Sequence, residues 1–277
     1  KGYAWGVCDR SDADKYRRLL KEGKEIESRL AEDLDAHLNA EIALGTVTDL
    51  EDVMDWLETT FYYVRAKSAP DEYASESDLR DRVSDTLRSL VERGFVERED
   101  MRLEATALGR LASKFYLRLD TAREFADLAE REGDLDAEGV LRAVATAAEF
   151  DSVSARSDEE DAVAAVLGSA DDRDPGTRKV LAILQSRMSG TTPGELQSDA
   201  WVITQNALRL LASLRAFLDR FDGPRAGNLA RRIEARIENG ISDDAVGLTA
   251  IDGVGSGRAS KLAAEGLTTP AEVRAAG

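Results

Sequence analysis

Apolar residues recur at the spacing of an α-helix along almost the whole stretch from Thr106 to Phe221. Short polar or glycine-containing segments interrupt this stretch and divide it into roughly five helices. The longest of them is expected to run from about Pro193 to Phe221, with one buried face. The residues of that face are Ile203, Ala207, Leu210, Leu214, Phe217 and Phe221. The pattern predicts a mainly α fold built around a helical bundle.

A helical segment and a small β-hairpin precede the bundle. After a break at Ala69–Asp71, helical spacing covers Asp78–Arg93 and ends at Gly94. Two short β segments, Phe95–Arg98 and Met101–Glu104, are then expected to pair. Helices followed by such a hairpin are typical of a winged helix. Winged helices either bind DNA or serve as packing scaffolds, and the pattern leaves both roles open.

The first part of the chain is predicted to contain a strand and several helices. Lys1–Arg10 alternates apolar and other residues and is predicted to form a buried strand. Its apolar side chains are Tyr3, Trp5 and Val7. Ser11–Glu58 is predicted to be helical, with one helix ending at Gly45. The next helix is expected to begin with a capping box of Thr48 and Glu51.

A glycine turn lies close to the end of the sequence. Gly253-Val254-Gly255 separates one short predicted helix, Ile241–Ile251, from a second, Gly257–Glu265. Glycines permit backbone conformations that are closed to other residues, and they let a ligand approach the main chain. Successive amides after such a turn, at the start of a helix, form an anion site. The spacing favours a helix–hairpin–helix that binds DNA phosphates without reading sequence, and the alternative is an ordinary turn between helices.

The residues of this turn are expected to have different roles. The amides would bind phosphate, Val254 would anchor the turn in a core, and the two cations would reach neighbouring phosphates. The candidate DNA-binding residues of this segment are Gly253, Val254, Gly255, Gly257, Arg258 and Lys261.

Two further helical faces are candidate DNA-binding surfaces. In the long helix, Trp201, Gln205 and Arg209 recur every four residues. An indole, an amide and a guanidinium in a row suit single-stranded nucleic acid; the alternative is a solvated face whose tryptophan touches a neighbouring element. Asn228–Asn239 follows a predicted linker at Phe221–Arg225 and is the most basic stretch of the chain. Its candidate DNA-binding side chains are Arg232 and Arg236.

The charge of the chain conflicts with a conventional basic DNA-binding surface. The sequence contains 54 Asp and Glu against 37 Lys and Arg, which gives a formal net charge of -17. These acidic residues are spread throughout, which favours adaptation to high salt over an ordinary acidic protein. Affinity from counterion release collapses as salt rises. DNA binding would then have to rest on main-chain amides, stacking and enclosure of the strand.

The sequence offers little catalytic chemistry. Cys8 is the only cysteine and His37 the only histidine, so a disulfide, a thiolate zinc site and a His-based triad are not expected. No phosphate-binding loop of the G-x-x-x-x-G-K-[ST] type is present. We therefore expect no catalytic residue, no metal site and no cofactor in this chain. No apolar run of membrane length and no signal peptide is visible, so a cytoplasmic location is expected.

Four stretches, taken in order, resemble a known family. They are Glu25–Leu30, Trp56–Tyr63, Thr106–Ser113 with Tyr116, and Gly253–Ala259. Their order resembles the C-terminal half of archaeal superfamily-two DNA helicases of the HELQ-like (Ski-type) family, and the acidic composition points to a haloarchaeal member. The resemblance covers essentially the whole chain.

The resemblance implies a domain plan. Residues 1–10 would be the last strand of a RecA-like motor domain, 11–119 a winged-helix domain with leading helices, 120–222 a helical ratchet bundle of the Sec63-like type, and 223–277 a helix–hairpin–helix domain. The motor domains, with the ATP and Mg²⁺ that they use, would lie upstream. This chain alone is therefore expected to be inactive.

The family unwinds DNA 3′ to 5′ with ATP and is linked to stalled replication forks. The resemblance implies that this chain guides single-stranded DNA. The expected partners are single-stranded or forked DNA, the upstream motor domains, and replication or repair proteins, with no membrane.

The sequence departs from the family in its long helix. Relatives present an Arg and a Trp to the strand there, whereas the matching positions in this chain are Gln205 and Arg209, with an indole at Trp201. This departure favours a second hypothesis, a protein-interaction scaffold without DNA contact. A third hypothesis is a DNA-binding subunit of a nuclease or recombinase, against which the collinear winged helix argues.

Overall fold

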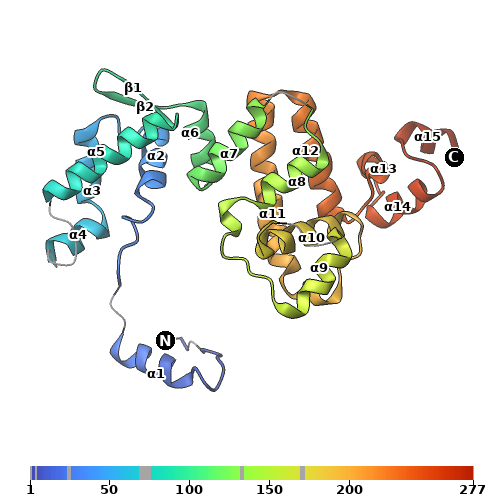
Figure 1. Cartoon of the computed structure of the whole chain (residues 1–277), viewed down its shortest axis with the longest axis horizontal. Coiled ribbons are helices and arrows are strands. Elements are labelled where there is room, and N and C mark those ends of the chain that lie inside the picture. Colours follow the sequence, from blue (N-terminus) through green and yellow to red (C-terminus); the bar gives the residue numbers. More distant parts are fainter. Residues whose placement is uncertain are drawn as a thin grey trace.

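The computed structural model describes residues 2–3, 5–23, 26–68, 76–131, 134–168 and 172–276. Lys1, Glu25 and the break predicted at Ala69–Asp71 lie outside the described residues. Within the described ranges the chain is mainly helical, and its strands form one small hairpin (Figure 1). The helices form a group around the hairpin, then a bundle, then a small terminal group (Figure 1). The mainly α fold predicted from the sequence is confirmed.

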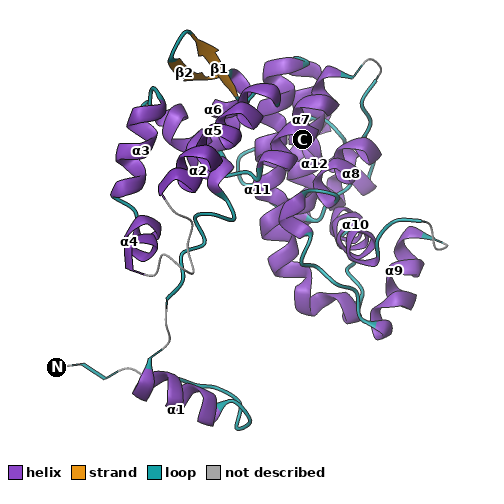
Figure 2. Ribbon diagram, turned by 60° about the vertical axis from the view of Figure 1, so that its left-hand side comes forward, coloured by secondary structure: helices purple, strands orange, loops and turns teal. Residues whose placement is uncertain are grey.

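The N-terminal segment lies apart from these groups. Helix α1 (Ala13–Glu22) buries none of its residues and is separated from the other helices in both views (Figures 1 and 2). The described residues of Lys1–Arg10 form no strand here, and Tyr3, Trp5 and Val7 are exposed; a strand of an upstream motor domain at this segment stays a prediction. A strand requires a hydrogen-bonded neighbour, and no described segment pairs with this one.

The group around the hairpin is the winged-helix unit. Its elements are α2 (Leu34–Leu44), α3 (Leu50–Glu58), α4 (Phe61–Ser68), α5 (Glu76–Glu92), β1 (Val96–Glu99), β2 (Arg102–Ala105) and α6 (Ala107–Lys114). The two strands are antiparallel, as predicted. Gly45 and Gly94 have φ values of 76° and 77° and end α2 and α5, also as predicted.

The start of α3 differs by one residue from the predicted capping box. Asp49 is the N-cap, and its carboxylate accepts a 2.9 Å hydrogen bond from the amide of Asp52. The carboxylate of Asp52 in turn accepts hydrogen bonds of 2.8 and 2.7 Å from the amide and hydroxyl of Thr48. Glu51, expected in that role, instead pairs with Arg80 of α5 at 3.0 Å. Glu51 and Asp52 are adjacent acidic residues, so spacing alone could not decide which of them bonds back to the start of the helix.

Gly109 allows α6 to lie close to the beginning of the hairpin. Asn39 of α2 donates a 3.0 Å hydrogen bond to the carbonyl of Gly109. The hydroxyl of Thr106, the N-cap of α6, donates to the carbonyls of Gly94 and Phe95 at 2.7 and 3.1 Å. A Cβ on residue 109 would collide with the Phe95 carbonyl. The packing of the winged-helix unit therefore depends on glycine at this position.

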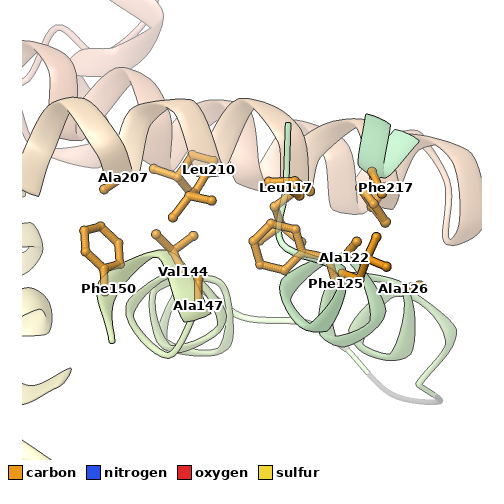
Figure 3. Close-up of a cluster of buried hydrophobic side chains, with 14 of the residues drawn as sticks. Leu117, Ala122, Phe125, Ala126, Val144, Ala147, Phe150, Ala207, Leu210 and Phe217 are labelled. Carbon is orange, nitrogen blue, oxygen red and sulfur yellow. The ribbon is translucent and has the colours of Figure 1, made fainter. Parts of the chain in front are cut away.

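Six helices of the described ranges make up the bundle. They are α7 (Leu119–Glu130), α8 (Ala137–Ala145), α9 (Glu160–Leu167), α10 (Pro175–Met188), α11 (Gln197–Phe221) and α12 (Pro224–Asn239). The buried face predicted for the long helix is confirmed, although Phe221 is only partly buried. Phe217 of α11 meets Phe125 of α7 edge to face at 5.9 Å between ring centroids. Leu117, just after α6, also points toward α11, beside Leu210 (Figure 3).

Helices α11 and α12 form a hairpin of their own. Only residues 222–223 separate them, so the linker predicted at Phe221–Arg225 is wrong. The glycine–proline pair that suggested a linker makes a tight corner instead, with the proline in the first turn of α12. Ala230, Ile233 and Ile237 of α12 belong to the core of the bundle. α12 was expected to open the terminal domain, but its packing places it in the bundle.

The terminal group has a separate small core. It consists of α13 (Asp243–Val246), a 3-10 turn (Gly247–Ala250), α14 (Ser256–Ala264) and α15 (Pro270–Ala276). Its buried residues are Ile241, Ala245, Leu248 and Ala259. The helix predicted at Ile241–Ile251 is therefore shorter than expected and continues as the 3-10 turn. The turn and the second helix form where the sequence placed them.

Candidate nucleic-acid interface

The glycine turn presents main-chain amides to solvent. Gly253 has a φ of 78°, which favours glycine, and Gly255 is the N-cap of α14. Within the described part of the chain, the amides of Gly255, Ser256 and Gly257 make no hydrogen bond. A Cβ at residue 253, 255 or 257 would meet no heavy atom within 4 Å. These three amides, called the amide turn below, form an open donor surface at the start of a helix.

The turn is fixed from behind by its own small core. The amide of Val254 donates to the carbonyl of Ile251 at 3.0 Å, and the Val254 side chain packs against the core, as expected. Ala259 is fully buried, and its amide donates to the carbonyl of Gly255 at 3.0 Å. The donors are therefore held in place before any ligand arrives, which lowers the entropic cost of binding.

Two cations of α14 lie near the amide turn. Nη1 of Arg258 donates a 2.6 Å hydrogen bond to the carbonyl of Gly253, which places the guanidinium over the turn. Lys261, one helical turn later, is exposed. Neither side chain pairs with a carboxylate from the described residues, although the chain as a whole is strongly acidic. No described carboxylate therefore neutralises either cation, and both can pair with a phosphate.

A second candidate surface runs along α11. Trp201 is 71% exposed, and Gln205 and Arg209 lie at the next two positions of the same helical face. Four-residue spacing puts them one above the other, and the first and last are roughly 12 Å apart along the axis. Trp201, Gln205 and Arg209 are called the α11 face below.

Arg209 also connects the bundle to the winged-helix unit. Its Nη1 donates a 3.0 Å hydrogen bond to the carbonyl of Phe115, the C-cap of α6. Its Nε and Nη2 donate to the side-chain oxygen of Asn206 at 3.4 and 3.1 Å. Both acceptors are uncharged oxygens, so neither of them neutralises the guanidinium. The sequence pattern gave no sign of this link because Phe115 lies far from Arg209 along the chain.

A buried ion cluster, which the sequence pattern did not reveal, holds the first turn of α11. Lys179 of α10 has a side chain that is only 2% exposed, and its Nζ lies 2.8 Å from Glu159 and 2.5 Å from Asp199. Arg156 lies 2.6 Å from the other oxygen of Glu159. Asp199 belongs to the first turn of α11, two residues before Trp201. The cluster thus fixes the end of the helix that carries the exposed indole.

The members of the cluster keep one another charged. Burial would raise the pKa of Glu159, but the Arg156 amide and the Lys179 ammonium outweigh burial and lower this pKa. The hydrogen bond from Lys179 lowers the pKa of Asp199. Burial would lower the pKa of Lys179, yet its hydrogen bonds to Asp199 and Glu159 raise that pKa above the usual value. All of these groups are therefore ionised at neutral pH.

The arginines predicted on α12 lie at its junction with α13. Nη2 of Arg232 lies 2.8 Å from a carboxylate oxygen of Asp243, and this hydrogen bond lowers the pKa of Asp243. Arg236 is partly buried, and its charge also acts on Asp243. Arg232 thus has a structural partner, and the two arginines do not form an open basic stripe.

The structure brings the candidate residues into two sites rather than one. The α11 face belongs to the bundle, whereas the amide turn belongs to the terminal group, which lies beyond α12 (Figure 1). Among the described residues, no three His, Cys, Asp or Glu side chains gather in a way that could hold a metal ion. The helices of the described ranges include none that is long and apolar enough to cross a membrane.

Two family models match this chain. Residues 105–245 match the model described as "Sec63 Brl domain", and residues 27–107 match the one described as "Winged Helix-turn-helix domain". The first covers the end of the winged-helix unit, the whole bundle and most of α13. The second covers the preceding helices and the hairpin.

Several curated proteins are similar to the chain. "Activating signal cointegrator 1 complex subunit 3" of Mus musculus is 32% identical over 255 residues, which cover 80% of this chain and 11% of that protein. "RQC trigger complex helicase SLH1" of Saccharomyces cerevisiae is 29% identical over 233 residues, 75% of this chain and 12% of that protein. "Probable ATP-dependent DNA helicase HFM1" of Mus musculus is 30% identical over 160 residues, 54% of this chain and 11% of that protein. The chain thus spans about a tenth of the length of these relatives.

Proposed function

The chain belongs to the Sec63 Brl domain family, and on this premise we propose that it is the strand-guiding part of an ATP-dependent DNA helicase. In this proposal it holds single-stranded DNA while RecA-like motor domains, outside residues 1–277, unwind 3′ to 5′ at replication forks under repair. ATP and Mg²⁺ would act in those motor domains. The winged helix ahead of the Sec63 domain and the helicase names of relatives support a helicase-associated role.

The amide turn is the observation that carries the proposal. It offers three unbonded amides at the start of α14, with the Arg258 guanidinium over the turn. Main-chain amides are neutral, so their hydrogen bonds to phosphate release few counterions and lose little affinity in salt. This is the kind of contact that a chain of net charge -17 can make with DNA, particularly in a haloarchaeal cytoplasm.

The α11 face supplies a contact of a different kind. An exposed indole with a charged guanidinium two helical turns away can stack on bases and pair with phosphate. Stacking tolerates any base, which suits a protein that moves along a strand. Gln205 adds a donor and an acceptor between the two.

Proline at residue 256 tests the amide turn without disturbing the helix. Ser256 is the first residue of α14, and proline is well tolerated there because its missing amide has no helical partner. Ser256→Pro should therefore fold normally and lose one of the three donors. A hydrogen bond to a charged group contributes about 1.5 to 3 kcal/mol, so binding to a labelled oligothymidylate should weaken by about tenfold or more. Fluorescence anisotropy across a series of KCl concentrations, from low to molar salt, would measure this.

Ala137→Pro is the matched control. Residue 137 is the first residue of α8, so the substitution makes the same change at a helix remote from the amide turn. It should leave the affinity unchanged. Equal affinities of the wild type and Ser256→Pro would remove the amide turn from the proposal. Failure of the wild type to bind any single strand would remove the proposal itself.

A comparison of DNA with RNA narrows the substrate. The names of the relatives include both DNA and RNA helicases. We expect the chain to bind an oligodeoxynucleotide at least as tightly as the matching oligoribonucleotide, and to bind a forked duplex through its single-stranded arm. A clear preference for RNA in the same anisotropy assay would contradict the DNA assignment.

A second candidate function is a protein-interaction scaffold. Trp201 and Val202 are adjacent and are 71% and 62% exposed, and such a pair can also seat against another protein. The mouse relative "Activating signal cointegrator 1 complex subunit 3" is named as a subunit of a complex. Trp201→Ala separates the two functions, because it should weaken oligonucleotide binding if the indole stacks on bases and should leave it unchanged if the indole serves a protein partner.

A further inference from the structure

Tyr116 occupies a backbone position that usually belongs to glycine. α6 ends with Phe115 as its C-cap, after which the amide of Tyr116 donates to the carbonyl of Ser113 at 3.2 Å. The amide of Leu117 donates to the carbonyl of Ala112 at 3.0 Å. This pair of bonds is the Schellman ending of a helix, in which the residue after the C-cap is left-handed. Tyr116 has a φ of 52° accordingly.

The local packing gives no reason for an aromatic side chain at this position. Tyr116 is 90% exposed, and its hydroxyl makes no hydrogen bond with any residue that the structure describes. A Cβ is unfavourable in left-handed backbone, so glycine would fit with less strain. The next residue, Leu117, is buried against α11 and fixes the ending (Figure 3). An exposed aromatic held in a strained conformation points to a ligand.

The surroundings of Tyr116 indicate the chemistry of that ligand. The carbonyl just before it, that of Phe115, accepts the hydrogen bond from Arg209 at 3.0 Å. Tyr116 therefore lies at the guanidinium end of the α11 face. Lys114, two residues earlier in the chain, lies with its ammonium 5.3 Å from the centroid of the Phe115 ring. Lys114 and Arg209 form no ion pair with a carboxylate in the described ranges, so two cations that no carboxylate neutralises lie close to Tyr116 along the backbone.

We infer that Tyr116 is a base-stacking residue that continues the α11 face onto the winged-helix unit. One nucleobase stacks on its ring, and the adjoining phosphates lie near Arg209 and Lys114. Trp201 stacks a second base roughly 12 Å from Arg209 along α11. The ligand is a single-stranded nucleic acid, read through stacking and charge rather than through base edges. This inference rests on the proposed function and adds a contact outside the bundle.

Three substitutions at residue 116 test the inference. Tyr116→Gly and Tyr116→Asn both suit left-handed backbone and lack the ring, so their Tm should equal or exceed that of the wild type. Their affinity for oligothymidylate should fall about tenfold. Tyr116→Phe keeps the ring and should bind within about twofold of the wild type. An oligonucleotide with 5-iodouracil should photocrosslink to residue 116 in the wild type, as located by mass spectrometry.

The outcomes separate this inference from the function that it rests on. If the wild type binds and Ser256→Pro weakens binding, while Tyr116→Gly binds like the wild type without a crosslink at residue 116, only the inference about Tyr116 fails. If the wild type binds no single strand, both the proposed function and the inference about Tyr116 fail. A Tm well below that of the wild type in Tyr116→Gly would show that the ring has a packing role and would also overturn the inference.

Discussion

At the scale of single residues, Lys179 shows how a charge can be essential inside an acidic protein. Its substitution by methionine removes the buried ammonium from Glu159, which is fully buried and keeps only the half-exposed Arg156 as a cationic partner. Breaking a buried pair costs about 3 to 5 kcal/mol when the remaining charge has no other partner, so with Arg156 still in place the loss should be roughly the lower end of this range or less, which urea denaturation would measure. The double variant Lys179→Met/Glu159→Leu removes both buried charges and should lie much closer to the wild type. A stable single variant would show that the cluster does not support α11.

The same cluster sets a pH range for stability. The pKa values of Glu159 and Asp199 are lowered in the folded protein, so their contribution is present above roughly pH 4 and is lost as pH falls through the folded values. The pKa of Lys179 is raised, so its contribution is present below roughly pH 10 and is lost as pH rises through its folded value. The Tm should therefore be highest between these limits. At constant ionic strength, acid should lower the Tm of Lys179→Met/Glu159→Leu less than that of the wild type.

At the scale of elements, Gly109 controls how α6 meets the hairpin. Gly109→Ala would force the helix away from the Phe95 carbonyl and is expected to cost about 1 to 3 kcal/mol. Thermal denaturation should show a lower Tm. The control is Gly257→Ala in α14, where a Cβ meets nothing within 4 Å. That variant should be as stable as the wild type or slightly more stable, because the alanine chain has less backbone entropy to lose on folding. Equal Tm values for the two variants would mean that α6 can shift without penalty.

The elements also show how far sequence patterns reach. Helical spacing and glycine ends predicted most helices and the hairpin, because both reflect local backbone preferences. The start of α3 at Asp49 could not be distinguished from one at Thr48, since either side chain can cap a helix. The segment around Asp222–Gly223 suggested a linker between domains. Only the packing of α12 against α11 shows that it is a tight turn between two helices of one bundle.

The same limit applies to the candidate site. The amide turn was predictable because its glycines lie close together in the sequence. The cluster of Lys179, Glu159 and Asp199, and the contact between Arg209 and Phe115, join residues far apart along the chain. No spacing rule connects such residues before the fold is known.

At the scale of the whole molecule, the net charge of -17 predicts a strong salt response. Self-repulsion extends over about 10 Å at ~0.1 M salt and about 3 Å at ~1 M. The free energy of unfolding should therefore increase between these concentrations of KCl. Each kcal/mol gained would raise the Tm by roughly 2 to 4 °C. A Tm that is independent of KCl would contradict this expectation.

A substitution of Glu124 tests at a single site whether repulsion between carboxylates causes the response of the Tm to salt. Partial burial raises its pKa, and the neighbouring carboxylates of Asp120, Asp151 and Asp127 raise it further. A raised pKa in a carboxylate means that its charge destabilises the fold at neutral pH. Glu124→Gln should therefore raise the Tm in dilute KCl and have a smaller effect in molar KCl. An effect that does not change with salt would point to packing rather than charge.

The placement of α12 has a mechanical consequence. Helix α12 is the last helix of the bundle and also the element to which the terminal group is connected. The ion pair of Arg232 and Asp243 stabilises the junction between α12 and α13. If a nucleic-acid strand binds at both proposed sites, tension applied at α14 would be transmitted through α12 to α11, whose N-terminal part carries Trp201. The two proposed sites would then be mechanically coupled through α12, so that a displacement of the strand at one site would exert force at the other.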